Sequence, residues 1–493
     1  MRLNLLKLSR PWTILVAVVL LLSGTVRAAT YYVDFETGSD RNSGTSKTSP
    51  WKHSPAMAPF SGTYNAATSD RFIYKGGVTW PNSALPLLIK TGGTEAAPAY
   101  HGVDKSWYRG TNWSRPRFDA QNQLFTNHGG NRGNVIWVAA PDVRIEGLEI
   151  TRFVFEDPAP RSNSDGFGIY GYRAHNMSVE DVFIHNWEVR AYTDSKFGGL
   201  AAQDTDNAIA KNCIVIAPKA VAAEFVTDSK GGQTSGCGII GFTLIDGCEF
   251  IGTTQGIWGG RVIRNNIVRD GQKSFDAAAH ENGAWVQNTA DFYNNRIFNV
   301  GEGVGVYFLP GWGGRENHRI NVFNNIFFDT PQINLTPQDS PSSTNEIWFF
   351  NNVIKQSSFC IQVGTTKQGE AFRKLVISNN IFISEWKYSN PNRVVSILDV
   401  TDLGVGFSSE ANEVFTLSEA NDAGMSTSNF FKPASTERLA LRGTNNSSIT
   451  TADIEGQMRP TSGAWDIGPY QLTNQSGLQP PNPPSALVVK EKM

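Results

Sequence analysis

The chain has 493 residues, of which 18% are charged, and its formal net charge at pH 7 is −2. With no basic run, this balance gives no electrostatic surface for nucleic acid, so we expect no nucleic-acid partner. The four cysteines are too few for a disulfide framework in a chain of this length, and they lack the spacing of a zinc site.

The N-terminus has the pattern of a signal peptide. A basic segment precedes an apolar stretch, Ile14–Leu22, and Val26 and Ala28 stand at positions −3 and −1 of a cleavage site. We expect residues 1–28 to be removed and the protein to be secreted or periplasmic. A retained anchor helix is the alternative, but the apolar stretch is shorter than the ~20 residues that a bilayer span needs. We therefore expect no stable membrane span after cleavage.

An Asn pair followed by a short apolar strand recurs through the second half of the chain. The second Asn of the pair stands at positions 266, 295, 325, 352 and 380, in steps of 29, 30, 27 and 28 residues. Upstream, we place Gly147, Asp181, Asn212 and Gly247 in the same position of the repeat. Such steps predict one supersecondary unit that stacks on its neighbours. The short β-branched and aromatic runs between Gly and Asn exclude helical repeats.

Asn and Gly suit this position because both tolerate the left-handed conformation of a tight bend. Stacked Asn side chains can also hydrogen-bond from one coil to the next. We therefore predict that the strands after this position form one parallel sheet.

A second ladder precedes the Asn position by one strand, and each member begins with Gly or Cys followed by an apolar residue. Because alternate strand residues face opposite sides, the apolar residue should face the core and the next residue should face outward. The predicted outward column is Tyr170, Ala201, Ile240, Trp258, Trp285, Tyr307 and Gln362.

Both ends of the chain resemble a known group. The segments Tyr31–Ser46, Asp70–Gly77 and Arg459–Tyr470 are similar to those of secreted right-handed parallel β-helix proteins of the pectate-lyase-like superfamily, and the resemblance covers about residues 31–471. It implies an all-β fold, a right-handed parallel β-helix of about ten coils with an N-terminal cap, and a polysaccharide partner. That superfamily contains lyases, hydrolases, epimerases and non-catalytic adhesins, so the resemblance does not select the chemistry.

Three parts are expected after the signal peptide. Residues 29–132 should form the N-terminal cap and first coils, and residues 133–470 should form the β-helix, with the last coils completed by about 395–470. Residues 471–493 contain a Pro-rich run and are expected to be an extended tail. We expect a monomer.

Four aromatic residues of the outward column, Tyr170, Trp258, Trp285 and Tyr307, are the candidate sugar-binding residues. A flat exposed ring can stack on the apolar face of a sugar. The alternative is packing beneath an overlying loop, for which the insertion 310–315 beside Tyr307 is a candidate. The sequence leaves both alternatives open.

Ionisable residues cluster on the same coils, and we select Arg261, His280, Glu281 and Glu302 as candidate catalytic residues. A uronate lyase needs a cation or metal to neutralise the carboxylate and a base to remove the C5 proton, whereas a hydrolase needs an acid and a second carboxylate. The chain lacks the Asp-Pro-His run of uronan epimerases and the Asp-Asp pair with a following His-Gly of polygalacturonase-type hydrolases.

Two further features leave alternatives open. The Asp204–Asn207 run could bind calcium, although an Asp-rich turn is more often only a turn, so a cofactor stays unassigned. Cys213 and Cys248 fall in one position of neighbouring coils, where a disulfide is geometrically allowed, but stacked core thiols are the favoured interpretation.

The leading functional hypothesis is a secreted lyase that cleaves an acidic, uronate-containing polysaccharide. A glycoside hydrolase is second. A non-catalytic glycan-binding or surface adhesion protein is the alternative from another class.

Overall fold

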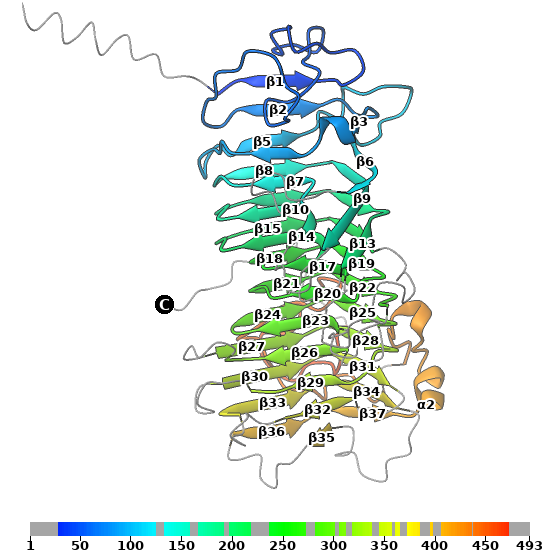
Figure 1. Cartoon of the computed structure of the whole chain (residues 1–493). Coiled ribbons are helices and arrows are strands. Elements are labelled where there is room, and N and C mark those ends of the chain that lie inside the picture. The colour runs from blue at the N-terminus through cyan, green and yellow to red at the C-terminus, as the bar shows by residue number, and fades with distance from the viewer. Residues whose placement is uncertain are drawn as a thin grey trace, which may run out of the picture.

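The computed structural model describes most of the chain, and its strands stack into one elongated solenoid (Figure 1). The described residues are 28–124, 133–157, 166–191, 197–217, 236–272, 282–300, 305–311, 318–337, 345–356, 360–364, 372–384, 395–397, 406–435 and 437–472. Except for Ala28, the predicted signal peptide lies outside them, as does nearly all of the Pro-rich tail. Among the described residues, no helix is both long and apolar enough to cross a bilayer.

Three parallel sheets, here named A, B and C, run along the solenoid. Sheet A has 13 strands: β1 (Thr30–Val33), β2 (Arg71–Tyr74), β5 (Ala99–Gly102), β8 (Val143–Glu146), β11 (Ser178–Glu180), β15 (Ile209–Lys211), β18 (Leu244–Asp246), β21 (Val262–Arg264), β24 (Ala290–Tyr293), β27 (His318–Phe323), β30 (Asn345–Phe350), β33 (Lys374–Ser378) and β36 (Phe407–Glu410). Sheet B has 11 strands: β4 (Leu87–Ile89), β7 (Ile136–Val138), β10 (Gly166–Tyr172), β14 (Phe197–Gln203), β17 (Gly236–Ile240), β20 (Gln255–Trp258), β23 (Asn282–Gln287), β26 (Val306–Leu309), β29 (Ile333–Leu335), β32 (Ile361–Val363) and β35 (Val395–Ile397).

Sheet C has 13 strands, including β13 (Glu188–Ala191), which pairs beside β9. The others are β3 (Thr79–Pro81), β6 (Arg117–Leu124), β9 (Glu149–Asp157), β12 (Phe183–His185), β16 (Ile214–Ile216), β19 (Glu249–Ile251), β22 (Ile267–Arg269), β25 (Arg296–Phe298), β28 (Ile326–Phe328), β31 (Val353–Gln356), β34 (Ile381–Ser384) and β37 (Glu413–Phe415). Each coil adds one strand to each sheet, so the fold is the predicted right-handed parallel β-helix.

The predicted repeat is confirmed in sheet C. The strands that follow the Asn position, β9 through β34, are consecutive members of this sheet, and every neighbouring pair is parallel. The predicted Asn ladder is also present. In each step, the backbone N–H and the side-chain amide of one Asn donate to the side-chain oxygen of the Asn in the next coil at 2.9–3.1 Å. The ladder continues one coil further, from Asn380 to Asn412.

One part of the predicted register is corrected. The pairing of Glu249 with Ile267 aligns Gly247 with Asn265, the first Asn of its pair, and not with Asn266. The left-handed conformation belongs to this first residue, since φ is 67° at Gly247 and 58° at Asn265. The second Asn faces the interior. In the upstream coils that inward position holds Leu148, Val182, Cys213 and Cys248.

The Gly ladder of sheet B has a steric cause. A Cβ at Gly238 would lie 2.4 Å from a ring carbon of Phe250 and 2.5 Å from the carbonyl oxygen of Gly256. A Cβ at Gly256 would lie 2.4 Å from the carbonyl oxygen of Gly283. These two coils therefore need Gly here so that the next coil can approach at the parallel-sheet spacing.

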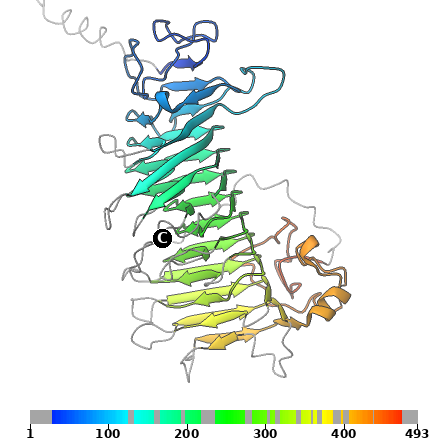
Figure 2. The ribbon, with the colours of Figure 1, turned by 45° about the vertical axis from the view of Figure 1, so that its right-hand side comes forward.

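The coils end at β37, so residues 416–472 differ from the expectation that coils continue to about residue 470. This segment contains α2 (Leu417–Asp422) and lies outside the lower coils (Figure 2). It packs on outward side chains of sheet C that are apolar, among them Ile326, Val353 and Ile381, whereas the upper part of that face carries charged residues such as Glu149 and Glu249. Apolar outward positions need a cover, and this segment supplies it.

Polar contacts fix the same segment to the outer Asn column. Asn351 donates to the carbonyl oxygen of Gly468 at 2.8 Å, and Asn379 donates to that of Thr444 at 2.7 Å. Trp465 is fully buried in a cluster with the stacked rings of sheet A. The segment therefore closes the corner between sheets A and C.

Candidate functional site

The predicted outward column lies on sheet B. Strand pairing places Trp258 beside Trp285 and Trp285 beside Tyr307, on three consecutive coils. The column continues in both directions, through Trp137, Tyr170, Ala201 and Ile240 above and through Asn334 and Gln362 below. The inward neighbours Ile257, Ala284 and Val306 are fully buried, as strand alternation predicts.

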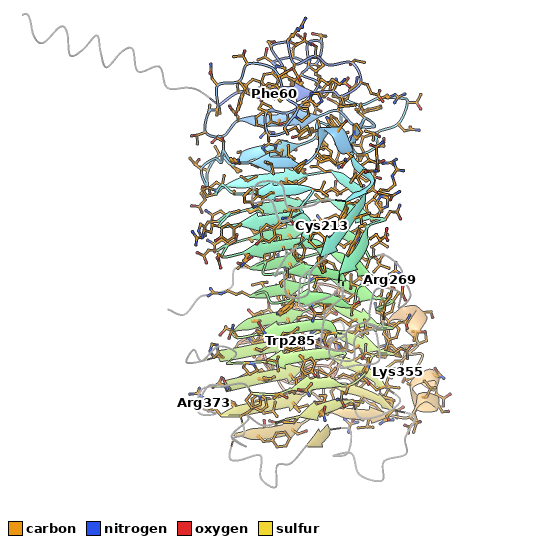
Figure 3. The ribbon with its side chains drawn as sticks, in the orientation of Figure 1. Phe60, Cys213, Arg269, Trp285, Lys355 and Arg373 are labelled. Carbon is orange, nitrogen blue, oxygen red and sulfur yellow. The ribbon has the colours of Figure 1, made fainter. Side chains whose placement is uncertain are left out.

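The three rings form a continuous stack, with Trp285 in its middle (Figure 3). The ring centroids of Trp258 and Trp285 are 6.1 Å apart, those of Trp285 and Tyr307 are 5.0 Å apart, and both pairs are tilted by about 40°. Trp258 and Tyr307 are partly exposed, but Trp285 is only 8% exposed. Burial raises the pKa of the Tyr307 hydroxyl. The middle ring is therefore a packing element as much as a contact surface.

Tyr170 does not join this stack. It is 3% exposed and belongs to a buried cluster with Phe167, Ala201 and Cys237, against which Trp258 also packs. Ala201 and Ile240 separate it from Trp258 along the column. The expected open ring at Tyr170 is thus a buried one, because its neighbour Phe167 packs against it at 6.0 Å.

A depression of about 310 Å³ lies at the turn from sheet B to sheet A, beside the ring stack. Its lining includes Gly259, Gly260 and Arg261, which directly follow Trp258, and Gln287, which lies two residues after Trp285. The remaining lining residues are Gly241, Phe242, Thr243, Asn288, Thr289 and His318. None of these described lining residues is acidic.

Arg261 gives this depression its charge. It is exposed, and among the described residues its guanidinium forms no ion pair, whereas Arg264 of the next strand pairs with Asp246 at 2.8 Å. Asn288 has a φ of 63°, and its side-chain oxygen is buried without a hydrogen-bond partner. The depression therefore offers one cation, two threonine hydroxyls and the Gln287 amide to a ligand.

Arg261 thus lies in this depression, three residues after Trp258, and its catalytic role stays a prediction. His280, Glu281 and Glu302 lie outside the described residues, so their place relative to Arg261 stays a prediction. Gln287 and His318 also line the depression and were not among the predicted site residues. Alternation puts Gln287 two residues after Trp285 on the outward side, and that signal could have found it, whereas His318 comes from a later coil.

The Asp204–Asn207 run forms a turn stabilised by its own neighbours. The Thr205 hydroxyl donates to the carbonyl oxygen of Gln203 at 2.8 Å, and Asp206 lies 3.3 Å from His175. No group of three or more His, Cys, Asp or Glu residues in the described part of the chain is arranged to hold a metal ion. Calcium therefore has no assigned site.

Cys213 and Cys248 do stack in one position of neighbouring coils, and both are buried free thiols (Figure 3). Burial, together with the hydrogen bond to Cys213, raises the pKa of Cys248 well above its ordinary value. Burial likewise raises the pKa of Cys360 to about 12. These thiols act as small core residues, in agreement with the favoured interpretation.

A scan against protein-family models finds no match to this chain, and neither does a search of curated proteins. Among solved structures, the chain is similar to pectate lyase Pel9A, with 15% identity, a TM-score of 0.46, and coverage of 92% of this chain and 98% of that chain. It is also similar to the GH136 lacto-N-biosidase from Eubacterium ramulus, with 13% identity and a TM-score of 0.39. The selenomethionine and native forms of that enzyme cover 82% and 79% of this chain, and 70% and 68% of their own lengths. The likeness concerns the β-helix fold alone.

Proposed function

We propose that this protein binds a polysaccharide chain along the outer face of sheet B and cleaves a uronate-containing polysaccharide by β-elimination. The observation that carries the proposal is the row of Trp258, Trp285 and Tyr307 beside a depression in which Arg261 is exposed and forms no ion pair with any described residue. A stack that runs along the solenoid axis suits a chain-like ligand better than a compact one. The partly exposed rings of Trp258 and Tyr307 offer contact area to the apolar side of successive sugars.

The charge of the depression favours an acidic substrate. An exposed guanidinium with no carboxylate beside it can take a uronate carboxylate in a bidentate hydrogen bond. The hydroxyls of Thr243 and Thr289 and the amide of Gln287 can bond sugar hydroxyls around it.

β-Elimination needs the carboxylate neutralised and a base near C5. The base takes the C5 proton, the electron pair forms the C4–C5 double bond, and the bond from C4 to the glycosidic oxygen breaks. The leaving oxygen then takes a proton. In this proposal Arg261 neutralises the carboxylate, and His280, Glu281 and Glu302 are the candidates for the base and the acid.

The test is incubation with polygalacturonate, alginate and hyaluronan, and with the neutral polymers xylan and galactan. Ultraviolet absorbance would follow unsaturated ends, and a reducing-sugar assay would follow all new chain ends. Unsaturated ends from an acidic polymer would support the proposal. Reducing ends without unsaturation would replace it by hydrolysis, and binding with neither product would replace it by a non-catalytic glycan-binding or adhesion role.

The variant Arg261→Gln tests whether the positive charge in the depression contributes to catalysis. We expect kcat/KM on the acidic polymer to fall about 10²-fold, as when one preorganised charge-stabilising donor is removed. Arg373→Gln is the matched control, because Arg373, labelled in Figure 3, is also exposed but directly precedes β33 of sheet A and pairs with Glu346. Equal activities of the two variants would remove Arg261 from the mechanism.

A further inference from the structure

The backbone of Ala29 forms hydrogen bonds with residues of the N-terminal cap. The backbone nitrogen of Ala29 donates to the carboxylate of Asp70 at 2.8 Å, and the carbonyl oxygen of Ala29 accepts from Arg71 at 2.8 Å. Thr30, the next residue, begins β1 and pairs with Arg71. Ala28, in contrast, is exposed. The first residue that the cap binds is therefore the residue after the predicted cleavage site.

Asp70 is a buried carboxylate, only 1% exposed. Its second oxygen accepts from the Tyr64 hydroxyl at 2.8 Å and from the Ala67 backbone at 3.0 Å. Among the described residues, no lysine, arginine or histidine forms an ion pair with it. Every hydrogen bond that it receives thus comes from a group that is neutral while the chain continues through Ala28.

The three other buried aspartates of residues 29–124 do have such partners, and Asp119 pairs with Arg152. Asp34 lies 2.7 Å from the ammonium of Lys75, and Asp40 lies 2.8 Å from a ring nitrogen of His53. A buried ionised group without a countercharge is costly, because it loses the solvation of water and gains only dipoles. Asp70 is therefore the one buried aspartate of this cap, in its described residues, that still needs a cation.

We propose that removal of the signal peptide between Ala28 and Ala29 creates this cation: the new α-ammonium of Ala29 forms an ion pair with Asp70 and locks the N-terminal cap. A peptidase that accepts Val26 and Ala28 at positions −3 and −1 would hydrolyse the bond. Water supplies a hydroxyl to the Ala28 carbonyl carbon and a proton to the Ala29 nitrogen as the C–N bond breaks. At neutral pH the amine takes one further proton, and the new carboxyl group of Ala28 releases one.

Removal of the signal peptide then changes the charge of the Ala29 nitrogen without changing its position. The nitrogen already lies at hydrogen-bond distance from the carboxylate, so cleavage converts a neutral donor into a charged donor at the same place. The exported form is consequently more stable at its first coil than the precursor, where unpaired strand edges would otherwise be exposed.

The experiment compares two full-length mature chains, one that begins at Ala29 and one with Gly-Ser before Ala29. Mass spectrometry of the exported protein should first give a chain that begins at Ala29; any other start overturns the proposal. We expect the extension to lower Tm by about 2–5 °C, the range for loss of one buried charge partner in a chain of this size. Hydrogen exchange of the peptide that contains β1 should become about tenfold faster.

Two variants separate the charge from the added length. In Asp70→Asn the extension should no longer change Tm, whereas in Asp34→Asn, the matched control in the same cap, its effect should persist. An extension effect of equal size in both variants would overturn the proposal. If Asp70→Asn does not fold, acylation of the α-amine at pH 7 decides: the mature N-terminus should react about tenfold more slowly than a free peptide of residues 29–34, and equal rates would overturn it.

Discussion

Replacement of Trp258 by Ala is the sharpest test of the ring stack. Trp258 is partly exposed, and its ring lies 6.1 Å from that of Trp285. Truncation of a fully buried Trp costs about 3–5 kcal/mol of folding free energy, and a ring that already keeps contact with solvent loses less. Truncation of an anchor ring in a binding surface costs about 1–3 kcal/mol of binding free energy. We therefore expect glycan affinity to fall about 5- to 150-fold, with a small change in Tm.

The assay is isothermal titration or affinity electrophoresis with the polymer that the activity panel selects, beside a thermal melt. Trp348→Ala is the matched control, because Trp348 is also a partly exposed outward Trp but lies on sheet A between the cations Arg319 and Lys374. Trp285→Ala, at 8% exposure, should instead lower Tm clearly. Unchanged affinity in Trp258→Ala, or an equal loss in Trp348→Ala, would refute the recognition surface.

Three further outcomes are expected. Asn325→Ala removes side-chain hydrogen bonds to the coils on both sides and should lower the free energy of unfolding by about 2–5 kcal/mol in denaturant melts, whereas an unchanged midpoint would contradict the ladder's role. Burial alone would raise the pKa of Glu149, but hydrogen bonds from His185 and Arg117 outweigh it and lower that pKa. The Tm difference between wild type and Glu149→Gln should therefore have its largest value near pH 6, where Glu149 is ionised, and should decrease as the pH falls below 4.5. A difference that does not depend on pH would contradict the stabilisation of the Glu149 carboxylate by His185 and Arg117. Cys213 and Cys248 should resist alkylation in the native protein and show no mass change on reduction.

Much of the architecture was readable from the sequence, because a solenoid repeats one local pattern. The Asn pairs recur at the length of one coil, and each coil buries its apolar side only against its neighbours, so position in the repeat determines position in space. Strand alternation likewise placed Trp258, Trp285 and Tyr307 in one outward column. These conclusions needed only the length of the repeat and the alternation of inward and outward residues along each strand.

The one-residue error in the alignment of Gly247 shows what the repeat pattern alone does not determine. Gly, Asp and Asn share a tolerance for positive φ, so the upstream bends could be aligned with either Asn of a pair. Only hydrogen bonding between coils decides which residue turns and which faces the core.

Contacts between segments that are far apart in the chain could not be predicted from the sequence, for a different physical reason. The burial of Trp285 depends on the tilt of rings from adjacent coils, and the depression around Arg261 is formed by three separate turns and the start of β27. The outer position of residues 416–472 depends on which face of sheet C is left apolar. The sequence by itself therefore determined the coil, its period and its outward column, because these follow from local conformation. The tertiary structure alone decided what covers each face and which polar groups meet, as the Ala29 N–H and the Asp70 carboxylate do, because such contacts depend on how distant segments pack.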